Sequence, residues 1–484
     1  RPEWLIRFAP NQIGRWEYKV SVRNKIGEDI SETLYFDCRQ NESSRSVVKR
    51  GFVRRARSDS LYFEFDNGDF YYPIGQNVCW AARYDDFLAK MSSHGENWVR
   101  VWMCPWHLPL EEKDDAGNYD LAVAKKLDDL LSLAEKHGIY VQLVFEYHGM
   151  AASSGSWAEN PYNQTNGGPC LAPGDFFEDA KARELFKRRL RYIAARWGYS
   201  TQVFAWELWN EVDLTEYREW DHVVAWHREM AGYLKAVDAQ KHLVTTSCYK
   251  DEPGDALYAL PQIDLAQAHR YTPQVTDFIV SVTQRVRKFN KPFFVAEFGR
   301  GWTPEVDQKD PTGAHLHAGL WSSFMTPAAG SAMLWWWDTF VEHNNLYPQW
   351  KALAAFAEGE DRRGQGFTLV TNQLNLPGKR KLTVQGLLSN SRGYFWFYDK
   401  AQTVEPRASQ TAVPAGTTFA LTGMFDGDYD VEFWDTYEGK VVKQAVVKAT
   451  SGTLKVTMPE FVEDTACKIK FKGVAVPTFV PNAN

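Results

Sequence analysis

The middle of this 484-residue chain alternates short apolar stretches with longer amphipathic ones, and this alternation restricts the possible folds most strongly. The apolar stretches have the length and composition of strands buried on both faces. They lie at residues 71–79, 98–104, 139–148, 203–211, 243–248, 263–271, 292–299 and 331–338. Helical stretches such as 121–138 separate them. From Gly75 to Trp335 the eight units cover 260 residues (335 − 75), close to the roughly 250 of a (β/α)8 TIM barrel.

A doubly wound open sheet is the rival fold for such an alternation. It is disfavoured because no Gly-rich phosphate-binding loop follows the first strand. The segment 149–174 is long and rich in Gly, Pro and Asn, and it follows the third strand. Barrel active sites lie at that end of the strands, so we expect a substrate loop there.

Shorter strand patterns flank the barrel on both sides. Residues 1–58 predict a small N-terminal β domain, part of a sandwich, and the start at Arg1 rather than Met suggests a processed or truncated beginning. Residues 59–362 form the expected catalytic barrel. Residues 363–484 return to short alternating strands with turns such as Asp426-Gly427, which predicts a C-terminal β-sandwich.

Charge and composition limit the partners. The net charge is −6 without a long basic run, so nucleic acid and anionic membranes are not expected partners. No apolar run approaches the roughly 18 residues of a membrane span. The six cysteines are scattered without zinc-like spacing and are expected to be buried apolar residues. With 20 Trp, some aromatic faces could line a groove for sugar rings.

Polar residues stand at the carboxyl ends of the expected strands, where a barrel collects its reactive groups. They include Arg100, His148, Asn210, Glu211, His269, Tyr271, Glu297, Trp335 and Trp337. Glu211 and Glu297 end the fourth and seventh strands and lie 86 residues apart (297 − 211). That is close to three strand–helix steps of roughly 31 residues each, so both could face the barrel mouth.

Two carboxyl groups across a groove are the machinery of glycoside hydrolysis. One carboxyl group is held protonated and donates its proton to the leaving oxygen, while the other attacks the anomeric carbon or activates water. The acid requires a raised pKa, which apolar walls could supply, and Trp206 and Trp209 are candidates for such walls. The other carboxylate must stay ionised, and Arg100 with Tyr271 could stabilise its charge.

The stretches around the two glutamates resemble the clan A glycoside hydrolases, especially family 5. The matching motifs are WNE at 209–211 and AEFG at 296–299. The resemblance implies that Glu211 is the acid/base and Glu297 the nucleophile of a retaining enzyme. Val212 departs from the pattern, because the family often has Pro after the acid/base.

The same resemblance, which covers the barrel, implies roles for the flanking residues. Asn210 binds the sugar 2-hydroxyl, Arg100 supports the nucleophile, His269 lies near the acid/base, Tyr271 contacts the nucleophile, His148 matches a strand-3 His, and Trp335 floors the first sugar subsite. Trp337 shares a strand face with Trp335 and is a further candidate contact. The stretches 7–20 and 426–441 are similar to β domains that precede and follow some of these barrels.

Several of these residues could instead have a purely structural role. Glu211 could be an acid that stabilises a helix N-terminus, Arg100 a structural ion-pair partner, and His148 and His269 core histidines. His315 and His317 follow the seventh strand, so they could also contact the substrate.

The sequence therefore predicts a retaining glycoside hydrolase that cleaves a β-linked poly- or oligosaccharide without metal or cofactor, and the resemblance implies a secreted or periplasmic protein. A carbohydrate-binding protein on a degenerate barrel and a transglycosylase are the alternatives. Sugar, linkage, endo or exo action and oligomeric state stay open.

Overall fold

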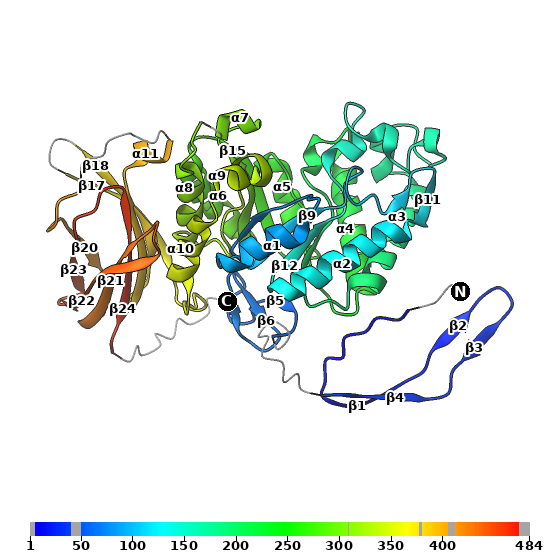
Figure 1. Cartoon of the computed structure of the whole chain (residues 1–484), viewed down its shortest axis with the longest axis horizontal. Helices are drawn as coiled ribbons and strands as arrows, with labels where there is room; N and C mark the ends of the chain where they lie inside the picture. Colours follow the sequence, from blue (N-terminus) through cyan, green and yellow to red (C-terminus); the bar gives the residue numbers. More distant parts are fainter. Residues whose placement is uncertain (1–4, 40–49, 308, 377–379, 405–411, 474–484) are drawn as a thin grey trace.

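A central barrel with further β-sheets at both ends of the chain makes up the computed structural model, which describes residues 5–39, 50–307, 309–376, 380–404 and 412–473 (Figure 1). Seven parallel strands form the barrel wall. They are β8 (Gly75–Asn77), β9 (Trp98–Trp102), β12 (Tyr140–Val144), β13 (Val203–Glu207), β14 (Leu243–Thr245), β15 (Ala266–Tyr271) and β16 (Phe293–Gly299). The first five pair in the order β14-β13-β12-β9-β8, and β15 pairs with β16.

The eighth position of the barrel differs from the expected strand at 331–338. There the chain runs beside β16, with the Met333 amide donating to Val295 (2.9 Å), but it makes only an isolated bridge, Phe298 to Leu334. The Ser331 amide donates to Pro73 (2.9 Å) and closes the ring beside β8. A π-helix then begins at Trp337, so the assumed alternation of Trp335 and Trp337 along one strand is wrong.

Helices surround this barrel, as the amphipathic stretches predict. They are α1 (Tyr84–Ser93), α2 (Leu121–His137), α3 (Ala180–Trp197), α4 (Trp220–Val237), α5 (Asp251–Tyr258), α6 (Val275–Val286), α8 (Ala314–Phe324) and α10 (Pro348–Ala357). Helix α2 shows how the sequence sets such bounds. Asp120 accepts hydrogen bonds from the amides of Ala122 and Val123 and caps its start, and left-handed Gly138 ends it. No helix in the described ranges is long and apolar enough to cross a membrane.

A three-stranded sheet closes the amino end of the barrel. It consists of β5 (Val53–Arg55), β6 (Phe63–Phe65) and β7 (Phe70–Tyr71). Phe63 is fully buried and meets Phe204 of β13 at a ring distance of 5.1 Å. Trp98, at the start of β9, joins the same apolar cluster. Apolar packing thus closes the end of the barrel away from the polar strand tips.

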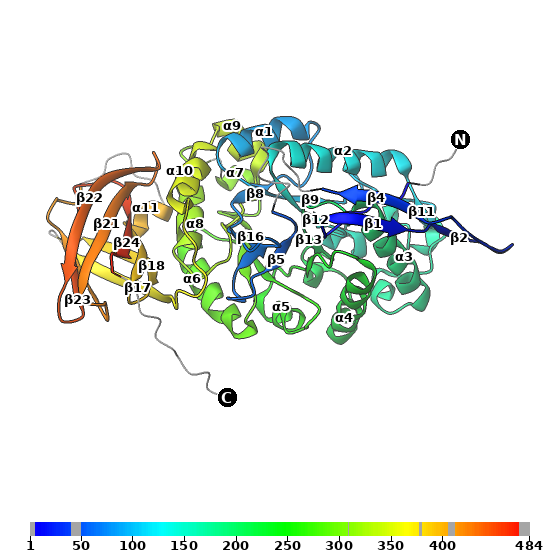
Figure 2. The same cartoon turned by 90° about the horizontal axis from the view of Figure 1, so that it is seen from below.

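The C-terminal residues form two antiparallel sheets over one apolar core. The larger has the order β17-β18-β19-β24-β21-β22, and β20 pairs with β23. Their bounds are β17 (Thr368–Asn375), β18 (Lys381–Leu388), β19 (Arg392–Tyr398), β20 (Thr418–Thr422), β21 (Gly427–Asp435), β22 (Lys440–Ala449), β23 (Thr453–Thr457) and β24 (Asp464–Phe471). Figure 2 shows these sheets beside α8 and α10.

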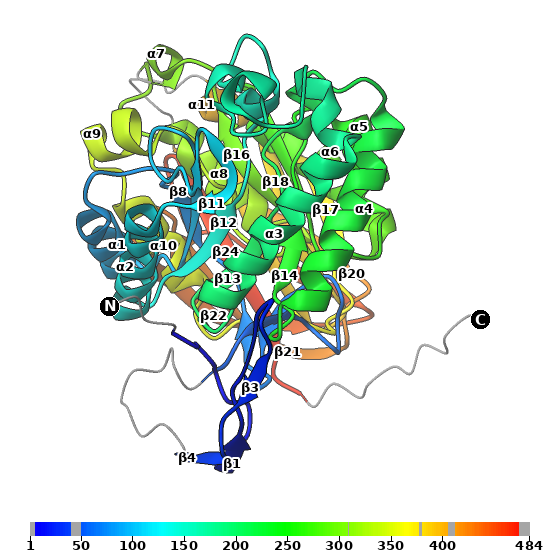
Figure 3. The same cartoon turned by 90° about the vertical axis from the view of Figure 1, so that its right-hand side faces the viewer.

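The N-terminal strands extend away from the barrel, as seen in Figure 3. Strand β1 (Gly14–Tyr18) pairs with β4 (Leu34–Cys38), and β2 (Ser21–Arg23) pairs with β3 (Glu28–Ile30). Residues 5–10 form no strand. Each strand here pairs with one partner, so this region is a pair of two-stranded ribbons among the described residues.

Candidate active site

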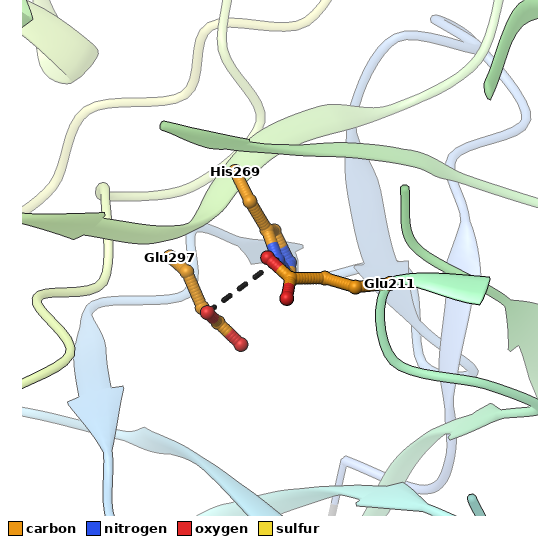
Figure 4. Close-up of side chains that lie close together, drawn as sticks. All are labelled: Glu211, His269 and Glu297. Carbon is orange, nitrogen blue, oxygen red and sulfur yellow. Dashed lines mark hydrogen bonds and ion pairs between the residues drawn. The ribbon is translucent and has the colours of Figure 1, made fainter. Parts of the chain in front are cut away.

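The two glutamates expected at the barrel mouth meet in the structure. Glu297 lies within β16, and Glu211 follows β13 by four residues. One carboxylate oxygen of each glutamate and a ring nitrogen of His269 all lie within 4.8 Å of one another (Figure 4). Only 6% of Glu211 and 2% of Glu297 is exposed. The two carboxyl groups thus face each other closely in a buried part of the barrel mouth.

Histidines and a serine hold Glu211. Nδ1 of His269 lies 3.0 Å from Oε1 of Glu211, and Nδ1 of His148 lies 3.4 Å from Oε2. The backbone of Glu211 is left-handed, with φ of 51°, a conformation that non-glycine residues rarely adopt. Its amide donates to the Ser247 hydroxyl over 3.0 Å. This bond from the segment after β14 helps to hold the unusual backbone.

Two donors hold Glu297. Nη1 of Arg100 donates to Oε1 over 2.6 Å, and the Tyr271 hydroxyl donates to Oε2 over 2.9 Å. Both bonds favour the ionised carboxylate. The structure therefore brings together the two residues that the sequence proposed as partners of Glu297.

Arg100 is fully buried and fixed by a second carboxylate, Glu207 of β13. Its Nε and Nη2 donate to the two oxygens of Glu207 over 2.8 and 2.7 Å. Nη2 also donates to Oδ1 of Asn210 over 2.6 Å. Arg100 is thus an ion-pair partner that links β9, β13 and β16. It is both the structural ion-pair residue and the support of Glu297 that the sequence offered as alternatives.

The surroundings give the two catalytic candidates different electrostatics. Burial raises the pKa of the Glu211 carboxyl to about 8, and the negative charge of Asp213 adds to this rise. Burial also raises the pKa of Glu297, but the charge and the hydrogen bond of Arg100 act in the opposite direction. We therefore assign the shared proton to Glu211 and the charge to Glu297.

The two histidines are neutral near pH 7. Burial lowers the pKa of His269 to about 4 and that of His148 to about 4. They act as hydrogen-bonding groups around Glu211 rather than as cations.

Glu211, His269 and Glu297 also have the spacing of a possible metal site. Arg100 already supplies positive charge to Glu297, and its repulsion disfavours a metal cation there.

An aromatic cluster borders the carboxylates. Trp335 is partly exposed and lies 5.0 Å from Trp102 and 5.8 Å from Trp80, ring centre to ring centre. The guanidinium of Arg100 lies 5.6 Å from the Trp102 ring, which connects this cluster to the charged network. Trp337 is 2% exposed and packs edge-on against Trp335, so it supports that ring from behind.

Four aromatic or histidine side chains that the sequence offered for the site pack outside it. Trp206 and Trp209 are not walls of the carboxylates: Trp206 packs on His242, and Trp209 on the Trp226 ring of α4. His315 and His317 lie on buried helix α8 rather than in a substrate loop. His317 stacks on Tyr437 with ring centres 4.0 Å apart, and so contacts the C-terminal sheets.

Comparison with known families agrees with this geometry. The sequence model of the cellulase family, glycosyl hydrolase family 5, matches residues 67–340, more than half of the chain. The chain belongs to glycosyl hydrolase family 5.

Its relatives in family 5 include plant mannan endo-1,4-beta-mannosidases. Number 3 of Oryza sativa subsp. japonica is 29% identical over 39% of this chain and 44% of its own length. Number 7 of Arabidopsis thaliana is 24% identical over 59% of this chain and 77% of its own length. The chain thus spans less than half of the rice relative and about three quarters of the Arabidopsis one.

A crystal structure shares the fold over almost the whole chain. It belongs to a proposed glycoside hydrolase from Bacteroides vulgatus ATCC 8482, with a TM-score of 0.64 and 16% identity. The match covers 96% of this chain and 90% of that one.

Three polar residues of this family 5 site were missed by the sequence reasoning. Glu207 holds Arg100, Ser247 donates to Glu207 over 2.9 Å, and Asn77 donates to the Ala296 carbonyl over 2.9 Å. Glu207 had a readable signal, because an acid inside a continuous apolar strand needs a buried cation. Asn77 and Ser247 had none, since their roles depend on contacts between distant strands.

Proposed function

We propose that this family 5 chain is a retaining glycoside hydrolase that cleaves a β-linked glycan by double displacement. The observation that carries the proposal is the pair Glu211 and Glu297, which bring one carboxylate oxygen each to within 4.8 Å and have different electrostatic surroundings. We take a 1,4-β-mannan backbone as the first candidate substrate, because the named relatives are mannan endo-1,4-beta-mannosidases.

The first step transfers the glycosyl group to the enzyme. A carboxylate oxygen of Glu297 attacks the anomeric carbon while the glycosidic C–O bond breaks. The Glu211 carboxyl gives its proton to the departing oxygen. Arg100 and Tyr271 keep the attacking carboxylate ionised and oriented.

The second step releases the sugar. Glu211, now ionised, takes a proton from water, and the water oxygen attacks the anomeric carbon. The bond to Glu297 breaks and the carboxylate is restored, with the configuration of the sugar retained. Asn210, His148, His269 and Trp335 are the proposed sugar-binding residues, and Trp337 is proposed to act through Trp335.

The flanking regions and the location follow the same proposal. We propose a small N-terminal β domain at 1–58, the last strand of which, β5, joins the sheet that closes the barrel, followed by the barrel at 59–362 and a β-sandwich at 363–484. The two antiparallel sheets over a shared core support the sandwich. A secreted or periplasmic location stays a prediction from the family resemblance.

The test is cleavage of mannan, β-glucan and β-galactan by the wild type and by Glu297→Gln. The variant should lose at least about 10³-fold in kcat yet still bind the polysaccharide, because only the attacking atom is gone. Glu112→Gln, an exposed carboxyl on the short strand β10 (Glu111–Glu112), is the matched control and should cleave normally.

Further readouts separate the alternatives. A 2-fluoro glycoside should label Glu297 covalently, and NMR should show the β anomer as the first product. A wild type that binds these glycans and cleaves none would identify a carbohydrate-binding protein instead. Transfer to an added oligosaccharide in preference to water would identify a transglycosylase.

A further inference from the structure

The turn that carries Glu211 is fixed to the neighbouring strand end by several bonds. The Val212 amide donates to the Ser247 carbonyl over 3.1 Å, a bond that Pro at this position could not make. The Leu214 amide donates back to the Glu211 carbonyl over 2.9 Å and closes the turn. This turn therefore depends on partners after β14 rather than on a rigid Pro.

Asp213 supplies the strongest of these links. It is only 8% exposed, and it is the residue of the strand-4 tip that the catalytic proposal leaves without a role. Its Oδ1 accepts the Tyr249 amide over 2.7 Å, and its Oδ2 accepts the Lys250 amide over 2.8 Å. Both oxygens of Asp213 are thus bound by protein N–H groups, so its hydrogen bonds are made without a sugar.

We propose that Asp213 is a positioning residue for Glu211: it fixes the turn that carries Glu211, and its negative charge keeps the proton on the Glu211 carboxyl. The inference rests on the proposed function, in which that proton is donated to the leaving group. An anion two residues away in a site shielded from water disfavours a second negative charge.

Other groups surround Glu211 and contribute to the same balance. They are Arg100 on β9, His148 after β12, Glu207 on β13, Cys248 after β14, His269 and Tyr271 on β15, and Glu297 on β16. Arg100 opposes protonation, while Glu207 favours it less strongly than Asp213. The two histidines are neutral and add no charge. Besides Glu297, which is the other carboxylate of the site, Asp213 is therefore the anion that most favours a proton on Glu211 after burial itself.

The activity test compares the pH dependence of kcat/KM in the wild type, Asp213→Asn and Asp213→Glu. Removal of the charge in Asp213→Asn should move the alkaline limb toward acid by about one pH unit. Asp213→Glu keeps the charge and should keep the limb near its wild-type position. An aryl glycoside whose leaving group needs no protonation should be cleaved by Asp213→Asn with a smaller loss than a glycan.

Glu216→Gln is the matched control. Glu216 lies on the same loop and also accepts a backbone amide across to the next loop, from Ser153 over 2.6 Å, but it is exposed. Its variant should leave the limb in place. A uniform fall of activity at all pH values in Asp213→Asn, with an unmoved limb, would reduce Asp213 to a structural anchor and overturn the proposal.

A direct titration separates this proposal from the proposed function. The ¹³C carboxyl signal that disappears in Glu211→Gln should titrate above pH 7 in the unreacted wild type, whether or not any glycan is cleaved. Titration near the ordinary value of 4.5 would overturn the role of Asp213 even if Asp213→Asn does not fold. Titration above pH 7 without cleavage of any glycan would instead contradict the proposed function alone.

Discussion

At the scale of single residues, Glu211 and Glu297 have the same side chain but different neighbours, and the neighbours give them different electrostatic properties. Glu297 receives a cationic and a phenolic donor, whereas Glu211 faces neutral histidines and the anion Asp213. The proposed double displacement needs this difference, because in it one carboxyl gives a proton while the other attacks.

The pH profile of kcat/KM should be bell-shaped, with an alkaline limb at about 8. Glu211 must carry a proton, and its protonated fraction falls as the pH rises through its pKa of about 8. Glu297 must be ionised, and since its pKa is raised, the acid limb should lie above the ordinary 4.5. Initial rates on a glycan across this range check both limbs. In Glu211→Gln the alkaline limb should disappear, and its persistence would assign the limb to another group.

Glu207→Gln should weaken both stability and activity, because it leaves the buried Arg100 short of an anion. The loss in the free energy of unfolding should be about 3–5 kcal/mol, typical of one broken partner in a buried pair. Urea unfolding measures this, and kcat on the best glycan measures the effect on Glu297. The exposed Glu438→Gln is the control and should change stability by less than about 0.5 kcal/mol. Equal behaviour of the two variants would contradict the role given to Glu207.

At this scale the sequence predicts the residues at the strand tips better than the buried contacts inside the barrel. Glu211 and Glu297 were readable because both stand at strand tips with the spacing of a barrel. The pairing of Arg100 with Glu207 was not, because which two buried charges meet depends on the register of non-adjacent strands. Asp213 was visible as an acid, but its partners are backbone amides that no side-chain pattern indicates.

At the scale of elements, apolar periodicity predicted seven of the barrel strands within a few residues. The predicted stretches ran past the strand ends because their polar tips turn into loops, as at 208–211. The prediction for the eighth stretch, 331–338, was wrong: its three tryptophans suit a strand, but the chain turns at Trp337 into a π-helix that ends at Val341. Strands β17 and β22 carry exposed polar residues, which weaken the alternating pattern that predicts a strand.

The sheet β5–β7 makes a prediction of its own. Phe63→Ala should lower the free energy of unfolding by about 3–5 kcal/mol, because it empties space among Phe204 and Phe294 at the closed end of the barrel. The alkaline limb should stay in place, since the change lies at the opposite end from Glu211. Ile26→Ala, on a side chain 96% exposed, should be neutral within about 0.5 kcal/mol. A moved limb in Phe63→Ala would show that the two ends of the barrel are coupled.

At the scale of the whole molecule, one face of the larger C-terminal sheet packs into the apolar core of the barrel, while its other face belongs to the separate core of the C-terminal sheets. Phe324 of α8 meets Tyr394 of β19 at 5.6 Å between ring centres, and Phe356 of α10 meets Trp434 of β21 at 5.4 Å. The buried Gln385 amide donates to the Ser322 carbonyl over 2.9 Å. The sequence predicted both regions but not the contact between them. The apolar residues on each side of the contact could equally have been buried within their own region, so the sequence pattern does not indicate that they meet.

The two regions should therefore unfold in one calorimetric transition. Phe324→Ala should lower the midpoint of that single transition, at a cost of about 3–5 kcal/mol, because both partners lose the same contacts. Val446→Ala on the exposed face of β22 is the control and should leave the midpoint unchanged. Two separate transitions, of which the variant moves only one, would show that the contact does not couple them.

The left-handed backbone at Glu211 has a consequence for how this chain evolves. A residue other than Gly held at φ of 51° costs about 1–3 kcal/mol, so Gly or Asn at position 211 would relax the fold. Mutation alone would therefore carry the position away from Glu once catalysis stopped being selected. If the proposed reaction is what keeps Glu at a backbone better suited to Gly, relatives that have lost the activity should show the loss first at this position.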